Sequence, residues 1–156
     1  MTDPTNVTTE LGADSVSATG TVPASPSDVF EFLRRPANHA VLSGDGSVRQ
    51  VVTGDAVLVD GSTFRMKMKV GVPYRVSSRV VEFEQDRLIA WSHFGGHRWR
   101  WELAPADGGT VVTETFDMST AKFPPALRLV GYPKRHRDNV QASVANLIAH
   151  FAPPAG

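Results

Sequence analysis

The residues best suited to chemistry are a glutamate and a histidine in the second half of the chain. Glu114 lies in the segment 110–117, which alternates apolar and polar residues. If the Glu114 side of this segment points inward, burial raises the pKa of the carboxyl, which then suits a general acid or base, and His97 could share that work. The sequence leaves the facing of the segment open. The plainer alternatives are a solvated His97 beside a turn and a pairing of Glu114 with Arg98 or Arg100 across a sheet.

Other reaction chemistries have no motif in this sequence. The chain contains no cysteine, which excludes thiolate catalysis and cysteine-ligated metals. Its histidines are scattered without an HxH or HExxH spacing, so we expect no metal site. The runs Gly44-Asp45-Gly46 and Gly95-Gly96 lack the strand-to-helix context and the lysine of a phosphate loop. We therefore expect no nucleotide and no other cofactor.

A set of large apolar residues falls on the strand faces that we expect to point inward. Such a set, interrupted by a few polar groups, is typical of a pocket for a small hydrophobic ligand, and equally of a filled core. We expect Tyr74 at the pocket mouth, where its hydroxyl could meet a ligand or simply stay wet. The predicted ligand-binding residues are Phe64, Met66, Met68, Tyr74, Ser92, Phe94, His97, Trp99, Trp101, Glu114, Phe116, Met118, Leu127, Val140 and Val144.

Strands and short helices must position these side chains. Residues 16–22 alternate like a strand with one buried face. Ser25 and Pro26 then favour the start of a short helix that ends before Pro36, and a second short helix is expected at about 37–42. Six strands are expected after these helices, among them 64–70, 72–83, 87–94, 97–103 and 110–117.

The pair Gly95-Gly96 predicts a two-residue hairpin loop, in which Phe94 faces His97. This register assigns every side chain of the two strands to a face. The expected inner face carries Leu88, Ala90, Ser92, Phe94, His97, Trp99, Trp101 and Leu103. The expected outer face carries Ile89, Trp91, His93, Arg98, Arg100 and Glu102.

The last part of the chain changes to helical periodicity. Val140, Val144, Leu147 and Ile148 form one apolar stripe, which predicts a helix of about 18 residues, or ~27 Å. The whole order predicts an α+β fold: a curved, seven-stranded antiparallel sheet wrapped around a long C-terminal helix, with two short helices between the first two strands. We expect a disordered N-terminal tail at 1–14, a single domain at 15–152 and a C-terminal tail at 153–156.

The bulk composition narrows the class of protein. The chain has 156 residues, a usual domain size, and its 16 basic residues balance its 16 acidic ones. A neutral chain has no overall field that attracts nucleic acid or an anionic membrane, so we expect no nucleic-acid partner and no stable membrane insertion. No apolar run approaches the ~20 residues of a membrane helix. Residues 1–12 lack the apolar core of a signal peptide, so we expect a cytoplasmic protein.

A series of segments follows a recognisable order along the chain: Val16–Val22, Pro23–Phe30, Pro36–His39, Val80–Phe83, Leu88–Trp91, Trp99–Leu103 and Gly108–Thr113. Over about residues 15–151 this order resembles the polyketide cyclase/dehydrase and lipid-transport branch of the START/Bet v 1-like (SRPBCC) superfamily. The resemblance implies a helix-grip fold with an internal cavity for lipids, polyketides or similar apolar ligands. It implies no particular reaction, because members include cyclases, dehydratases, carriers and sensors.

Three functions remain open from the sequence. The first is binding or carriage of a hydrophobic small molecule, lipid or polyketide-like, in a cavity between the sheet and the C-terminal helix. The second is a polyketide cyclase or dehydratase that uses acid–base residues such as Glu114 and His97 in the same cavity. The third is a protein-interaction module that uses Ile89 and Trp91 on the outer sheet face. The ligand and the oligomeric state stay open, with a homodimer as one option.

Overall fold

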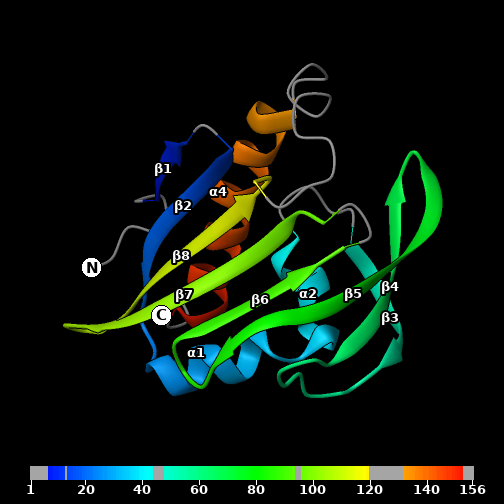
Figure 1. Cartoon of the computed structure of the whole chain (residues 1–156). Helices are drawn as coiled ribbons and strands as arrows, with labels where there is room; N and C mark the ends of the chain where they lie inside the picture. Colours follow the sequence, from blue (N-terminus) through cyan, green and yellow to red (C-terminus); the bar gives the residue numbers. More distant parts are fainter. Residues whose placement is uncertain (1–6, 13, 44–47, 94–95, 120–131, 153–156) are drawn as a thin grey trace.

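An eight-stranded antiparallel sheet curves around the C-terminal helix in the computed structural model of the chain (Figure 1). The structure describes residues 7–12, 14–43, 48–93, 96–119 and 132–152. The strands follow the spatial order β1-β2-β8-β7-β6-β5-β4-β3, so the sheet begins at the N-terminal strand and ends at β3. The strands are β1 Thr8–Leu11, β2 Ser15–Val22, β3 Val48–Gly54, β4 Thr63–Val70, β5 Val72–Glu84, β6 Leu88–Ser92, β7 Arg98–Ala106 and β8 Gly109–Asp117. The helices are α1 Pro26–Leu33, the 3₁₀ turn η1 Pro36–Asn38, α2 His39–Leu42 and α4 Tyr132–Phe151.

The helix-grip arrangement predicted from the sequence is confirmed. α4 has 20 residues and packs its apolar stripe, which includes Val140 and Val144, against the inner face of the sheet. β2 lies directly beneath it. A Cβ atom added at Gly20 would come within 2.8 Å of Ile148 Cδ1, so the glycine permits this close approach of helix and strand.

The two short helices form as their sequence indicates. Ser25 caps α1, because its hydroxyl accepts a hydrogen bond from the Asp28 backbone N–H at 3.2 Å. α2 follows η1 directly and turns back under the sheet. The Asn38 amide donates to the Phe32 carbonyl at 3.1 Å, and this bond ties the second helix to the end of the first. The connection brings His39 beneath the sheet.

The predicted N-terminal boundary and strand number are wrong. Thr8–Leu11 form β1 and pair with Val16–Thr19 of β2, so this part of the expected 1–14 tail is an edge strand. The sheet therefore has eight strands, where seven were expected. β1 is exposed and polar, and its pairing uses backbone groups of the neighbouring strand. Apolar periodicity cannot reveal a strand of this kind. Residues 153–156 lie outside the described part of the chain.

The predicted register of the β6–β7 hairpin is also wrong, by one residue. Trp91 pairs with Trp99 and Ile89 pairs with Trp101; β6 ends at Ser92 and β7 begins at Arg98, so the strands stop short of the expected two-residue loop. A shift of one residue moves a strand's side chains to the opposite face. Ile89 and Trp91 therefore point inward and are buried, at 0% and 8% exposure.

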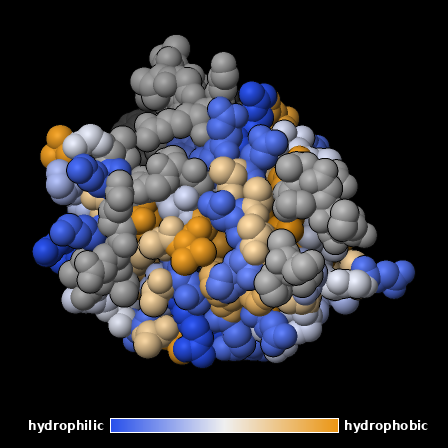
Figure 2. All heavy atoms as spheres, turned by 180° about the vertical axis from the view of Figure 1, so that it is seen from behind, coloured by the Kyte–Doolittle hydropathy of each residue, from blue (hydrophilic) through white to orange (hydrophobic). Residues whose placement is uncertain are grey.

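The surface away from the sheet is mixed in character. Seen from behind, the molecule shows hydrophobic and hydrophilic residues interspersed (Figure 2). In the part of the chain that the structure describes, no helix has both the length and the apolar character needed to cross a membrane.

Candidate functional site

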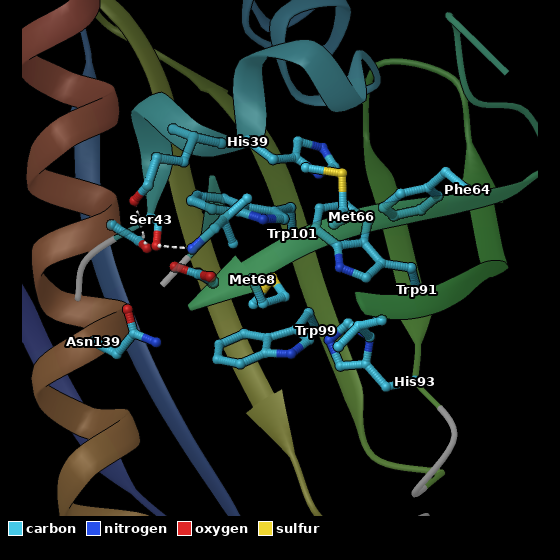
Figure 3. Close-up of a pocket in the computed structure, with 15 residues that line it drawn as sticks. His39, Ser43, Phe64, Met66, Met68, Trp91, His93, Trp99, Trp101 and Asn139 are labelled. Atoms are coloured by element: carbon cyan, nitrogen blue, oxygen red, sulfur yellow. Dashed lines mark hydrogen bonds between the residues drawn. The ribbon is translucent and has the colours of Figure 1, made fainter. Parts of the chain in front are cut away.

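A cavity of about 110 Å³ lies between the inner face of the sheet, α2 and α4 (Figure 3). Its walls come from almost every element that faces the interior. Asn139 points into it from α4, opposite Trp99 and Met68 (Figure 3). The lining residues are His39, Leu42, Ser43, Val48, Phe64, Met66, Met68, Val76, Trp91, His93, Trp99, Trp101, Glu114, Asn139 and Ser143.

Aromatic rings form most of one wall. The chain has three tryptophans, and all of them, Trp91, Trp99 and Trp101, line the cavity. Trp91 stacks on His39 with ring centroids 4.6 Å apart, and Phe64 meets the same histidine edge-on at 5.5 Å. Contacts of this kind favour the observed orientations of the rings, and they make this wall aromatic.

His39 belongs to this apolar wall as a neutral ring. Its Nε2 lies 2.9 Å from the Leu33 carbonyl oxygen, which can only accept a hydrogen bond, so Nε2 carries the proton and donates. Burial lowers the pKa of His39 from 6.5 to about 4, and the hydrogen bond to Leu33 offsets this only in part. The imidazole is therefore uncharged at neutral pH.

Glu114 faces the cavity from β8 and is 4% exposed. The facing that the sequence left open is thus settled: the Val112 side of β8 points inward. Burial raises the pKa of the Glu114 carboxyl well above its usual value. The Ser143 hydroxyl is its hydrogen-bond partner, and a donating hydroxyl would lower the pKa again.

A count of protons indicates that Glu114 is the donor in this pair. Ser143 has one hydroxyl proton, and it donates that proton to the Leu42 carbonyl at 2.8 Å. The Ser143 oxygen can then only accept from Glu114, which requires a protonated carboxyl. Burial and hydrogen bonding therefore both favour a neutral Glu114.

Two oxygen atoms of the lining residues Glu114 and Asn139 lack a hydrogen-bond partner in the part of the chain that the structure describes. Glu114 Oε2 and Asn139 Oδ1 are buried and have no hydrogen-bond partner among the described residues. A buried polar atom without a partner costs about 1–3 kcal/mol. Asn139 Oδ1 can only accept a hydrogen bond, and Glu114 Oε2 accepts one when the carboxyl proton lies on the other oxygen. This part of the cavity is therefore suited to a group that donates hydrogen bonds.

His93 lines the cavity near its edge, but His97 does not. The two rings lie on the same side, with centroids 5.2 Å apart, so the expectation that they occupy opposite faces is wrong. The Ser78 hydroxyl holds His93 Nδ1 at 2.6 Å. Burial, followed by the nearby His97 and other histidines, lowers the pKa of His93 to about 3. Burial alone lowers the pKa of His97.

The structure brings six of the predicted ligand-binding residues together on the cavity: Phe64, Met66, Met68, Trp99, Trp101 and Glu114. Others lie elsewhere. Tyr74 is 43% exposed on the β4–β5 hairpin, and Ser92 and His97 are half-buried off the cavity. The core residues Phe116, Met118, Val140 and Val144 are buried without lining it. Phe94 and Leu127 lie outside the described residues.

Nine lining residues were missed: His39, Leu42, Ser43, Val48, Val76, Trp91, His93, Asn139 and Ser143. Trp91 and His93 were missed because of the register error in β6. Asn139 and Ser143 did carry a signal, since each precedes a residue of the α4 apolar stripe by one position and the two lie four residues apart. No sequence pattern marks His39, because tertiary packing alone brings α2 beneath the sheet.

The alternative pairing of Glu114 with an arginine is wrong. Arg98 and Arg100 lie beside the carboxylate of Glu82, at 3.3 and 2.9 Å, and Arg100 also lies 3.6 Å from Asp117. These partly exposed ion pairs are separate from the buried glutamate. Among the described residues, no group of three or more metal-ligating side chains has a geometry that could hold a metal ion.

Comparison with known proteins agrees with this architecture. Residues 13–152 match the model of a family described as polyketide cyclase / dehydrase and lipid transport. An uncharacterized protein of Mycobacterium tuberculosis, Rv0088, is 38% identical over 154 residues, a match that covers 92% of this chain and 66% of the relative.

Solved structures share the fold at low sequence identity. Protein CV1439 from Chromobacterium violaceum has a TM-score of 0.71 at 20% identity, over 90% of this chain and 99% of that one. The di-domain ARO/CYC StfQ from the steffimycin biosynthetic pathway has a TM-score of 0.64 at 15% identity, over 88% of this chain and 50% of that one. The family match spans nearly the whole chain, and the chain therefore belongs to the polyketide cyclase / dehydrase and lipid transport family.

Proposed function

We propose that this chain binds a small hydrophobic molecule in the cavity between the sheet and α4. The observation that carries the proposal is a largely apolar cavity lining that includes two buried oxygen atoms without a hydrogen-bond partner among the described residues, Glu114 Oε2 and Asn139 Oδ1. The cavity of about 110 Å³ is close to the ~150 Å³ of an apolar protein cavity known to hold benzene, so a ligand part of about one aromatic ring fits it. Affinity would come mainly from apolar burial, at about 25 cal/mol per Å².

The two acceptors would orient the ligand. A hydroxyl or N–H placed beside Glu114 Oε2 and Asn139 Oδ1 satisfies atoms that otherwise stay unpaired. A molecule of the same size without a donor leaves this cost in place. The preferred ligand is therefore an aromatic or alicyclic group that carries a hydroxyl at the end nearest α4.

Tryptophan fluorescence tests the proposal directly, because every tryptophan of the chain lines the cavity. We expect phenol to change the emission saturably and to bind about tenfold more tightly than toluene, which has a similar volume but no donor, since one satisfied buried acceptor is worth about 1–3 kcal/mol. Glu114→Leu should remove most of this preference. Equal binding of phenol and toluene to the wild-type protein would refute the proposed orientation.

A cavity-filling variant supplies the matched control. Val76 lines the cavity, whereas Val59 is 48% exposed and does not. Val76→Phe should abolish the response to both probes, and Val59→Phe should leave it unchanged. If the two variants respond alike, the fluorescence change does not come from the cavity and the proposed function fails.

An acid–base enzyme is the second candidate. The observation in its favour is a buried carboxyl with a raised pKa that faces the same cavity as His93. Glu114 lines the cavity and His97 does not, so a histidine partner of Glu114 in catalysis would be one of the two lining histidines, His39 or His93. Glu114→Gln keeps the shape of the side chain but cannot release a proton. With a substrate in hand, catalysis requires that this variant loses turnover and keeps binding.

The hypothesis of a protein-interaction module relied on Ile89 and Trp91 at the outer sheet face. Both side chains are buried beneath the inner face, so they cannot form such a surface. A homodimer and a cytoplasmic location remain predictions from the sequence.

A further inference from the structure

The β4–β5 hairpin concentrates positive charge on a chain that is neutral overall. Residues 63–79 contain five basic residues and no acidic one. The whole chain has 16 of each kind, so 11 basic and 16 acidic residues remain elsewhere, a formal charge of −5. The prediction of no electrostatic attraction to a membrane rested on the net charge of the whole chain. That net charge does not reveal the local positive charge of the hairpin.

The register of the hairpin separates its charged side chains from its apolar ones. Lys67 pairs with Arg75, and Met68 pairs with Tyr74. Because successive strand residues alternate between faces, the basic residues share the outer face of the sheet and the apolar residues share the inner one. The outer-face cations are Arg65, Lys67, Lys69, Arg75 and Arg79. All five are exposed, and none forms an ion pair with another residue that the structure describes.

The tip of the hairpin exposes apolar side chains. Val72 and Tyr74 belong to the same face as Met66 and Met68, yet they are 72% and 43% exposed. The strands reverse at Gly71, whose φ of 72° suits a tight turn, and Figure 1 shows the tip standing away from the helices. The inner face of the hairpin is therefore covered near Met66 and uncovered at the tip, where Val72 and Tyr74 lie.

We propose that this hairpin docks the protein on an anionic lipid surface, with Val72 and Tyr74 entering the boundary between headgroups and acyl chains. Lys67, Lys69 and Arg75, which lie nearest the tip, contact the lipid phosphates. A thin element with one apolar and one basic face fits a membrane interface. An acidic protein would match the cations but would give no reason for an exposed valine and tyrosine between them.

Docking would also place one wall of the cavity at the membrane. The hairpin supplies Met66, Met68 and Val76 to that wall. If the proposed function is correct, the docked hairpin gives an apolar ligand a path from the bilayer to the cavity. The docking itself does not depend on the cavity being occupied, so the phenol titration and the vesicle experiment can fail independently.

Vesicle sedimentation tests the charged face. The full chain should sediment with vesicles of phosphatidylcholine plus phosphatidylglycerol, should stay in solution with phosphatidylcholine alone, and should be released by high salt. Each cation near such a surface contributes about 1 kcal/mol, so Lys67→Glu/Lys69→Glu should weaken binding at least about 30-fold. The matched control is Arg35→Glu/Arg87→Glu, which changes the net charge equally at exposed side chains outside the hairpin and should bind like wild type.

A second pair of variants tests the apolar tip. Val72→Ser/Tyr74→Ser should weaken binding to the anionic vesicles at least about tenfold and leave its salt dependence unchanged. Leu11→Ser/Val59→Ser removes two exposed apolar groups elsewhere, at 52% and 48% exposure, and should have no effect. Circular dichroism confirms that each variant is folded. The proposal is overturned by absent binding, by equal binding to neutral vesicles, or by equal losses in a hairpin pair and its control.

Discussion

Acidification should destabilise this protein through a histidine in the wall of its cavity. His39 is 6% exposed, stacked on Trp91, and has a pKa of about 4 in place of 6.5. As the pH falls below 6.5, the unfolded chain binds a proton at this residue and the folded chain does not. The unfolded state then holds more protons, so the free energy of unfolding decreases as the pH falls towards 4.

The magnitude follows from the two pKa values. One pKa unit corresponds to about 1.4 kcal/mol, so His39 should cost about 2 kcal/mol of stability between pH 7 and pH 5, and about 3 kcal/mol by pH 4. His39→Phe keeps an aromatic ring for the stack on Trp91 but cannot bind a proton. This variant loses the hydrogen bond to the Leu33 carbonyl, and should be less stable than wild type at pH 7.

Urea unfolding of both proteins at pH 7 and pH 5 isolates the contribution of His39. The other titrating groups are common to the two proteins, so wild type should lose about 2 kcal/mol more than His39→Phe over this interval. Equal losses would refute the reasoning. The same conclusion would follow if NMR showed His39 in the folded protein titrating near 6.5.

Two further changes test the buried carboxyl and the turn between β7 and β8. Glu114 should have the opposite pH dependence to His39, because the folded chain keeps a carboxyl proton that the unfolded chain releases as the pH rises above about 4.5. In urea unfolding between pH 5 and pH 8, Glu114→Gln should therefore gain stability relative to wild type as the pH rises. If the two proteins keep the same difference in stability over this range, the raised pKa is contradicted. Gly109→Ala should lower the thermal midpoint more than Gly108→Ala. A Cβ at Gly109 collides with the backbone carbonyl of Val22, whereas at Gly108 it meets nothing within 4 Å and the cost comes only from the positive φ of 78°. Similar midpoints for these two variants would show that the turn can relax.

The parts of the fold that local patterns specify could be predicted from the sequence. The alternation of apolar and polar residues in 110–117 predicted a strand with one buried face. In the structure, the buried face carries Glu114. The stripe of Val140 and Val144 fixed the helix that covers the sheet. In both cases the period of the apolar residues equals the period of the element, so burial follows from the sequence.

The register and the cavity wall could not be obtained in this way. The two glycines at 95–96 favoured a short loop, but β6 ends at Ser92 and β7 begins at Arg98. The resulting difference of register moves Trp91 from the outer to the inner face. α2 contributes His39 through tertiary packing, and a helix of this length has no periodicity to read. The five basic residues of the hairpin could be counted in the sequence, but the prediction considered only the net charge of the whole chain, which is zero.

A crystal structure of the protein isolated from its own cells, without unfolding or extraction, tests the central claim most directly. The account predicts electron density for a non-protein molecule against Trp99, with a donor group within hydrogen-bonding distance of Glu114 Oε2. The opposite result is a collapsed interior, in which Met66 and Met68 pack against Trp99 and leave room for no more than a few waters. A chain with that interior would have no space for the ligand that its proposed function requires.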